Sequence, residues 1–150
     1  MHRLGTHLLI ELGGCDPVLL DDLARIREAM IEAARKGRTT ILNTSFHKFS
    51  PQGVSGVIVL AESHISVHTW PEESYAAVDV FTCGDRAMPH LVAAHLIRAF
   101  SPRKYDIREI ARGVPGAVDR SGKVQAAESA AQVGEFEPGM RFASAGGGVA

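Results

Sequence analysis

The residues best suited to chemistry lie together in the segment ESHISVHTWPEESYAAVDVFTC, which runs from Glu62 to Cys83. It holds a Glu-Ser bond, two histidines, the only tryptophan of the chain and one of its two cysteines. Hydroxyl, imidazole and thiol groups are candidate nucleophiles, bases and acids. Because buried polar groups must be hydrogen-bonded, such a concentration in strand-like sequence indicates a function.

Each of these residues also has an ordinary structural interpretation. His68 could be a hydrogen-bonded histidine on a strand, Cys83 a small buried residue, and Trp70 a core or rim aromatic. Ser63 has no local signature, and the GVSG run at 53–56 lacks the spacing of a nucleophile elbow. The seven histidines form no H-x-x-x-H or H-E-x-x-H pattern on a predicted helix, so no metal site is expected. Taken residue by residue, the segment identifies candidate groups without identifying a reaction.

The elements that position these groups are predicted from turn residues and apolar spacing. Apolar residues recur every three or four positions from the helix start Asp16-Pro17 to the helix stop Gly37. A second helix is predicted from about Met88 to Phe100, and strands are predicted at residues 6–12, 39–49, 57–61, 64–70, 75–82 and 104–111.

Two strand patterns bear on the candidate site. From residue 64 to 70 apolar and polar residues alternate, so Ile65 and Val67 face one way and positions 64, 66, 68 and 70 the other. The unbroken apolar run at 57–61 is typical of a strand covered on both faces.

The element order predicts an α+β two-layer sandwich, a mostly antiparallel sheet with two helices on one face. A second copy of the chain is the simplest cover for the other face.

Length and composition favour one folded domain followed by a tail. The chain has 150 residues, 45% of them hydrophobic, and a formal net charge of −1, which favours neither nucleic acid nor an anionic membrane as partner. No membrane span or signal peptide is expected, and two distant cysteines predict free thiols in a reducing cytoplasm. Residues 113–150 hold eight of the fifteen glycines and are expected to be flexible, with at most a helical turn or two at 125–132.

Residues 46–85, FHKFSPQGVSGVIVLAESHISVHTWPEESYAAVDVFTCGD, closely resemble the prokaryotic S-adenosylmethionine decarboxylase proenzymes, the pyruvoyl-dependent enzymes of spermidine synthesis. The likeness covers about residues 1–112 and excludes the tail. It implies that the chain cleaves itself between Glu62 and Ser63, giving a β chain of 1–62 and an α chain that begins at 63.

The resemblance also implies a role for each reactive residue. Ser63 Oγ attacks the carbonyl carbon of Glu62, and Ser63 becomes a covalently bound pyruvoyl group that forms a Schiff base with the substrate. His68 is the proton acceptor in this processing, and Ser55 assists it. Cys83 is the proton donor in decarboxylation, which suits a thiol with an ordinary pKa of ~8.5. Because Ser63 is out of phase with His68 on the strand, it must lie at a turn for His68 to reach it.

Phe49, Trp70 and Glu72 match the substrate-binding positions of that family. The aromatic faces suit an adenine and a positive sulfur, and the carboxylate suits the ribose hydroxyls of S-adenosylmethionine. The family's sites lie at or near a dimer interface. The resemblance therefore implies a homo-oligomer of processed αβ units, (αβ)2 or higher, in which some contacts come from the other protomer.

Two other functions remain open at this point. Related pyruvoyl-dependent decarboxylases act on arginine or ornithine and share the processing residues, although the three pocket residues favour the nucleoside substrate. A non-catalytic relative that serves as a binding or regulatory partner is the second alternative. Loss of Ser63, His68 or Cys83 would favour it, and all three are present.

Overall fold

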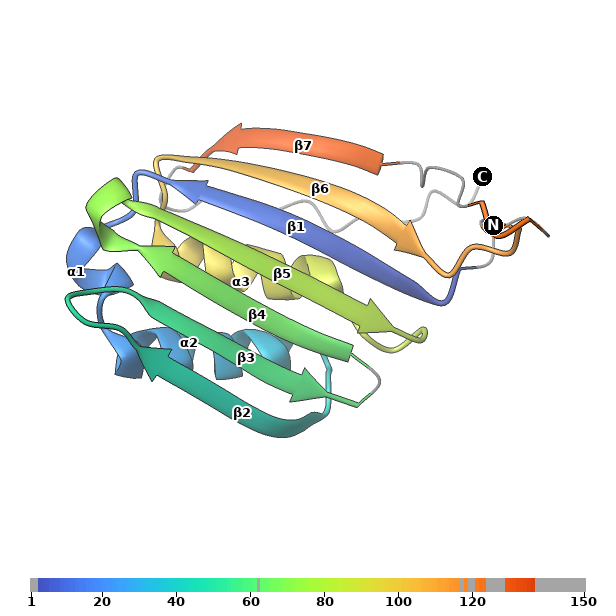
Figure 1. Ribbon diagram of the computed structural model, residues 1–150, viewed down its shortest axis with the longest axis horizontal. Coiled ribbons are helices and arrows are strands. Elements are labelled where there is room, and N and C mark those ends of the chain that lie inside the picture. The colour runs from blue at the N-terminus through green and yellow to red at the C-terminus, as the bar shows by residue number, and fades with distance from the viewer. Residues whose placement is uncertain (1–2, 62, 117, 119–120, 124–128, 137–150) are drawn as a thin grey trace.

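Seven strands form a single antiparallel sheet in the order β2-β3-β4-β5-β1-β6-β7 (Figure 1). The structure, a computed structural model, describes residues 3–61, 63–116, 118, 121–123 and 129–136. The elements are β1 (Gly5–Gly13), α1 (Pro17–Leu20), α2 (Leu23–Lys36), β2 (Ile41–Lys48), β3 (Val54–Leu60), β4 (Ser63–Trp70), the 3-10 helix η1 (Pro71–Glu73), β5 (Tyr75–Cys83), α3 (Pro89–Phe100), β6 (Lys104–Arg112) and β7 (Ser129–Glu135).

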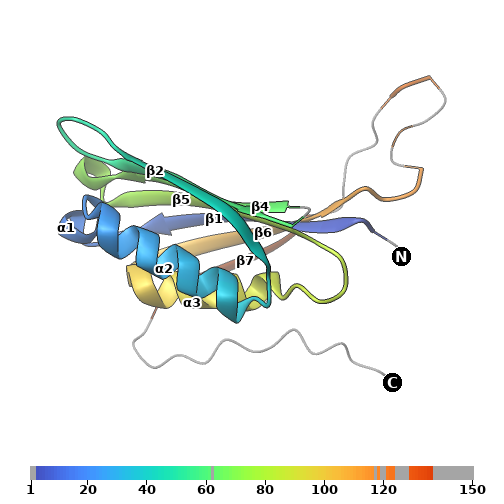
Figure 2. The same ribbon diagram turned by 90° about the horizontal axis from the view of Figure 1, so that it is seen from below.

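The two long helices, α2 and α3, lie side by side on one face of the sheet (Figure 2). Their apolar faces bury Ile26, Met30, Leu96 and Phe100 against alternate residues of the strands. The strand residues on this face, Leu8, Ile10, Ile58, Ile65, Val67, Val78 and Val80, are almost fully buried. The prediction of a two-layer α+β fold with two helices on one sheet face is confirmed.

The single helix expected from Pro17 to Gly37 is wrong, because the chain forms two helices there. The carboxylate of Asp16 accepts from the Val18 amide at 2.9 Å and begins α1. Asp22 accepts from the Arg25 amide at 3.1 Å and begins α2. A second N-cap within the apolar pattern therefore starts a new helix, since the capping residue itself has an extended backbone.

The interpretation of 57–61 as a strand covered on both faces is wrong for the single chain. Ile58 and Leu60 are buried, whereas Val59 between them is 41% exposed. The strand begins earlier than expected, at Val54. Because both long helices lie on one face, nothing in the described part of the chain covers the other face of β3.

The strand β7 lies in the segment for which the sequence predicted no strand. It pairs with β6 along its length, and Gly134 lies against the ring of Tyr105. Phe136, directly after it, packs against the core. Of the helical turn expected at 125–132, the described part is strand, and 124–128 and 137–150 lie outside the described residues. The free edge of β6 supplies the N–H and C=O groups that make a strand of a weakly apolar segment.

Candidate active site

The strand β4 carries candidate residues at both of its ends. Ile65 and Val67 are buried under the helices, and His68 and Trp70 are exposed on the opposite face, so the predicted alternation is confirmed. Ser63 is the first residue of β4 and pairs with Leu60 across a tight hairpin. Ser63 therefore lies directly after the turn that joins the two strands. Glu62 lies outside the described residues.

Ser63 and Cys83 lie at the same end of the sheet, and we call this end the serine–thiol end. The register of β4 and β5 pairs His64 with Phe81, which places Ser63 next to the last residues of β5. Cys83 ends that strand, is half-buried and has a free thiol. In Figure 1 the start of β4 and the arrowheads of β3 and β5 lie at the same end of the sheet. The sheet thus brings a hydroxyl at a turn and a thiol to the same end, with the two side chains directed to opposite faces by strand alternation.

Ser55 and His68 face each other at the opposite end of β4, which we call the histidine end. They are direct partners in the β3–β4 pairing, and Ser55 Oγ shares a hydrogen bond of 2.7 Å with His68 Nδ1. The His68 ring lies 6.3 Å from the Trp70 ring, and Trp70 lies 5.4 Å from Tyr75. The histidine is therefore held by a hydroxyl on one side and aromatic rings on the other.

The two ends of β4 are far apart within one chain. Ser63 and His68 are separated by five residues of extended strand, which is about 16 Å between Cα atoms. Strand alternation also directs their side chains to opposite faces of the sheet. The turn at Ser63 does not bring it within reach of His68 of the same chain, contrary to the sequence-based interpretation.

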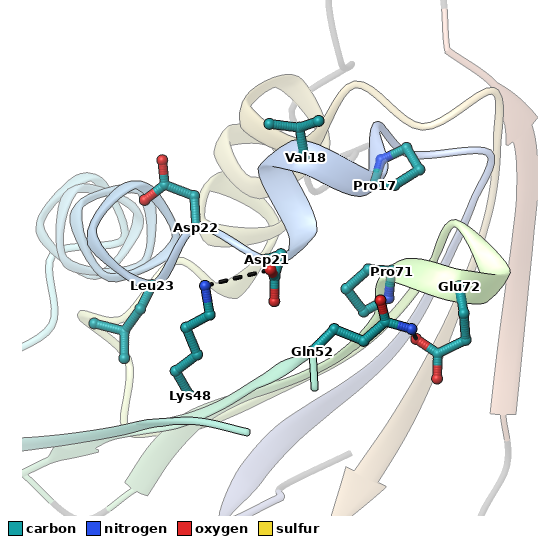
Figure 3. Close-up of a pocket in the computed structure, with 9 residues that line it drawn as sticks. All are labelled: Pro17, Val18, Asp21, Asp22, Leu23, Lys48, Gln52, Pro71 and Glu72. Carbon is teal, nitrogen blue, oxygen red and sulfur yellow. Dashed lines mark hydrogen bonds and ion pairs between the residues drawn. The ribbon is translucent and has the colours of Figure 1, made fainter. Parts of the chain in front are cut away.

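A pocket of about 770 Å³ opens beside the histidine end (Figure 3). It is lined by Pro17, Val18, Asp21, Asp22, Leu23, Lys48, Gln52, Pro71 and Glu72. Gln52 Nε2 donates to Glu72 Oε2 at 3.1 Å and joins the loop after β2 to η1. Of the three expected substrate-binding residues, Glu72 lines this pocket, whereas Phe49 and Trp70 are exposed outside it.

Asp21 fixes the loop that follows β2, and sequence reasoning missed it. Its Oδ1 accepts from the Gly53 amide at 2.9 Å, and its Oδ2 lies 3.3 Å from Lys48 Nζ. The Gly53 hydrogen bond is the largest cause that holds the pKa of Asp21 below its usual value, and with the help of the nearby Lys48 ammonium it outweighs the opposing effect of desolvation. The pair of aspartates at 21–22, which interrupts an apolar helix pattern, is the sequence feature that could have indicated this role.

A chain of hydrogen bonds crosses the uncovered face of the sheet, and the sequence did not reveal it either. His7 Nε2 lies 3.1 Å from Asp79 Oδ1, and Ser66 Oγ donates to Asp79 Oδ2 at 3.3 Å. Arg112 Nη1 donates to His7 Nδ1 at 3.0 Å. These residues come from four strands, so their proximity depends on a strand order that local patterns do not give.

The two cysteines differ in environment. Burial raises the pKa of the Cys15 thiol to about 12, which keeps it protonated and unreactive. The half-buried Cys83 is the accessible thiol of the pair.

Within the described part of the chain, no group of three or more His, Cys, Asp or Glu side chains could hold a metal ion. None of the described helices has the length and apolar content needed to cross a membrane.

Residues 6–113 match the model of the family described as S-adenosylmethionine decarboxylase. The S-adenosylmethionine decarboxylase proenzyme of Thermodesulfovibrio yellowstonii is 49% identical over 114 residues, which cover 76% of this chain and 84% of the relative. The proenzyme of Pyrococcus abyssi is 46% identical over 114 residues, covering 76% and 82%. The strand β7 lies beyond the matched residues.

Solved structures agree with these sequence matches. The crystal structure of the adenosylmethionine decarboxylase from Aquifex aeolicus has a TM-score of 0.72 and 36% identity, covering 76% of this chain and 94% of that one. The Trypanosoma brucei AdoMetDC monomer, at 19% identity and a TM-score of 0.55, shares the fold over 70% of this chain and 45% of that one. The chain therefore belongs to the S-adenosylmethionine decarboxylase family.

Proposed function

We propose that this chain is a self-processing, pyruvoyl-dependent decarboxylase. It would convert S-adenosylmethionine to S-adenosylmethioninamine and carbon dioxide, which is the aminopropyl-donor step of spermidine biosynthesis. The observation that carries the proposal is the placement of Ser63 directly after a hairpin turn, at the same end of the sheet as the accessible thiol of Cys83, in a chain of this family.

Processing would cut the chain into a β chain of 1–62 and an α chain that begins at 63. Ser63 Oγ attacks the carbonyl carbon of Glu62 and converts the peptide to an ester. Elimination breaks the ester C–O bond and frees the carboxylate of Glu62, and water then releases ammonia and leaves a keto group. A proton acceptor is needed at the serine hydroxyl, and the imidazole of His68, hydrogen-bonded to Ser55, suits that task.

The residues of the serine–thiol end fit a pyruvoyl group derived from Ser63. A strand terminus at a hairpin can be cut without opening the core, and Cys83 lies at the adjacent end of β5. When present, the group links covalently to the substrate amine and accepts the electron pair released with carbon dioxide. Cys83 then holds the proton that the product carbon must receive. The Phe81 ring lies close to this thiol.

The complete site would contain residues of two chains. One chain separates Ser63 from His68 by about 16 Å on opposite faces of the sheet. The face that carries His68 is uncovered and exposes apolar side chains, including Val59 and Trp70, each 41% exposed. A second copy packed on this face would cover those residues and bring its own histidine end to the first copy's serine–thiol end, whose Cys83 lies on this face. We therefore propose a homo-oligomer of processed units, (αβ)2 or higher.

Phe49, Trp70 and Glu72 are the proposed substrate contacts. All three lie at the histidine end, close to Ser55 and His68, and would belong to the copy opposite the reacting Ser63. Two exposed aromatic rings suit an adenine and a sulfonium, and a carboxylate suits ribose hydroxyls. Arginine or ornithine has neither a base to stack nor a ribose, so these residues favour the nucleoside.

Intact-mass measurement of the purified protein tests the processing. We expect two fragments separated between residues 62 and 63, with the larger, carboxyl-terminal fragment blocked to Edman degradation. A single full-length species after long incubation would contradict self-processing and would favour a non-catalytic relative. Release of carbon dioxide from S-adenosylmethionine, arginine and ornithine, measured in parallel, identifies the substrate, and preference for a diamino acid would overturn the proposed one.

A further inference from the structure

Gly5 of β1 lies directly opposite Cys83 of β5 in the antiparallel pairing. Side chains of directly opposite residues project from the same face and lie within about 4.5–5.5 Å of each other at Cβ. Gly5 has no side chain, and its place is filled from the neighbouring strand. A Cβ at position 5 would lie 3.1 Å from Cys83 Sγ and 2.7 Å from Phe81 Cε2. The thiol and the ring together occupy the notch that the glycine leaves.

We propose that Gly5 is a positioning residue for Cys83, because its missing side chain forms the notch that holds the thiol. The inference rests on the proposed function, in which this thiol supplies the product proton. A proton donor must come within about 2.6–3.2 Å of the atom that receives the proton. The position of Sγ along the sheet therefore decides whether the transfer takes place.

The Phe81 ring cannot readily move away from a side chain added at position 5. The ring of His7 lies 5.3 Å from it, the ring of His64 lies 5.8 Å from it, and the Arg112 guanidinium lies 5.3 Å from its centre. Two of these neighbours, His7 and Arg112, are themselves held by hydrogen bonds. Because a guanidinium only donates, His7 Nδ1 accepts from Arg112, and His7 Nε2 donates to Asp79. The ring is thus packed against groups that belong to three other strands, β1, β4 and β6.

The third neighbour of the notch is backbone. A Cβ at position 5 would lie 2.8 Å from the carbonyl oxygen of Thr82, which belongs to a central strand of the sheet. This oxygen can move only if β1 and β5 shift against each other. Since neither the ring nor the carbonyl yields easily, an added methyl group must displace Sγ of Cys83 directly or through a shift of its strand. Both routes move the thiol.

The test compares Gly5→Ala with Gly13→Ala, a change in the same strand. At Gly13 the nearest atom to an added Cβ is the Lys104 carbonyl oxygen at 3.8 Å, an ordinary contact. The first readout is the rate of alkylation of Cys83 by iodoacetamide, followed by peptide mass. Cys15 does not interfere, because its thiol is buried. The second readout is kcat and KM for carbon dioxide release from S-adenosylmethionine.

Gly5→Ala should change the alkylation rate of Cys83 by about tenfold. It should also lower kcat about 100-fold and leave KM within about twofold, since a displacement of about 1 Å is enough for such a loss. Gly13→Ala should match the wild type in every readout. A folded Gly5→Ala protein whose Cys83 reacts at the wild-type rate would overturn the proposal.

If Gly5→Ala does not fold, Phe81→Leu is measured in its place, because this substitution removes the ring that forms the other wall of the notch. Alkylation of Cys83 should then become faster, and a wild-type rate would overturn the proposal. The alkylation comparison is repeated in the Ser63→Ala chain, which cannot process itself. Failure of self-cleavage in the wild type would therefore refute the proposed function without affecting this measurement.

Discussion

The hydrogen bond between Ser55 and His68 determines which ring nitrogen of the histidine can act as a base. It engages Nδ1 of the imidazole at 2.7 Å and fixes the orientation of the ring on an exposed strand face. When Nδ1–H donates to Ser55 Oγ, Nε2 carries the free lone pair that a neighbouring molecule can use as a proton acceptor. A base presented outward in this way suits a reaction with a group of another chain better than a reaction within its own strand.

Replacement of Cys83 by alanine tests the role of the thiol. Cys83→Ala should leave self-cleavage complete, because the thiol is not needed for attack by Ser63, but it should lower kcat at least about 100-fold by removing the proton donor. Intact mass and carbon dioxide release measure the two steps separately. Unchanged steady-state turnover would exclude Cys83 as the donor. Cys15→Ala serves as the matched control, since its thiol is buried and protonated.

Local sequence predicts individual residues well when their position depends on one strand. The alternation of apolar and polar residues on β4 predicted that Ile65 and His68 lie on opposite faces of the sheet. Because Ser63 does not share the face of His68, the same pattern indicated a turn close to Ser63. The contacts of Gly5 and His7 depend on the pairing of β1 with β5, strands some 60 residues apart in the chain. No local pattern specifies such a register, so these residues could not be identified from the sequence.

At the scale of elements, the Asp21 carboxylate connects the end of α1 to the loop between β2 and β3. It accepts from Gly53 and pairs with Lys48, which immediately precedes Phe49. Asp21→Ala should loosen this loop and raise KM for S-adenosylmethionine about fivefold with little change in kcat. Asp21→Asn retains a hydrogen-bond acceptor and should have a smaller effect. Equal KM values for the wild type and Asp21→Ala would contradict this role for the loop.

The same carboxylate gives a pH dependence with a defined sign. The folded-state pKa of Asp21 is lowered, chiefly by the Gly53 amide. Its contribution to stability is therefore present above the unfolded-state pKa of ~3.9 and is lost as pH falls through the lower folded-state value. Thermal unfolding should show Asp21→Ala less stable than the wild type at neutral pH, with the difference disappearing in acid. A difference that grows in acid would contradict this.

Two elements show why local patterns fall short of the fold. The apolar spacing from Leu19 to Ala33 suits one helix, but capping by Asp22 divides it. Conversely, residues 129–135 have little strand character, yet they form β7 because the edge of β6 supplies backbone partners. In both cases a hydrogen bond made by the backbone outweighs the side-chain pattern.

At the scale of the whole molecule, the sheet has one covered and one open face, and the candidate site is divided between its two ends. The two-layer fold was predictable, because helix and strand periodicities are local. The division of the site was not, because it follows from the direction of β4, which carries Ser63 and His68 to opposite ends. If two copies pack face to face, the open face is covered, and the serine–thiol end of each copy can meet the histidine end of the other.

Complementation between two inactive chains tests this account most directly. His68→Ala retains Ser63, and Ser63→Ala retains His68, so neither should process itself efficiently alone. When the two are co-expressed with different tags and the mixed oligomer is purified, intact mass should show the His68→Ala chain cut between residues 62 and 63 and the Ser63→Ala chain intact. A purified mixed oligomer in which the His68→Ala chain stays full-length would contradict a site built from two chains.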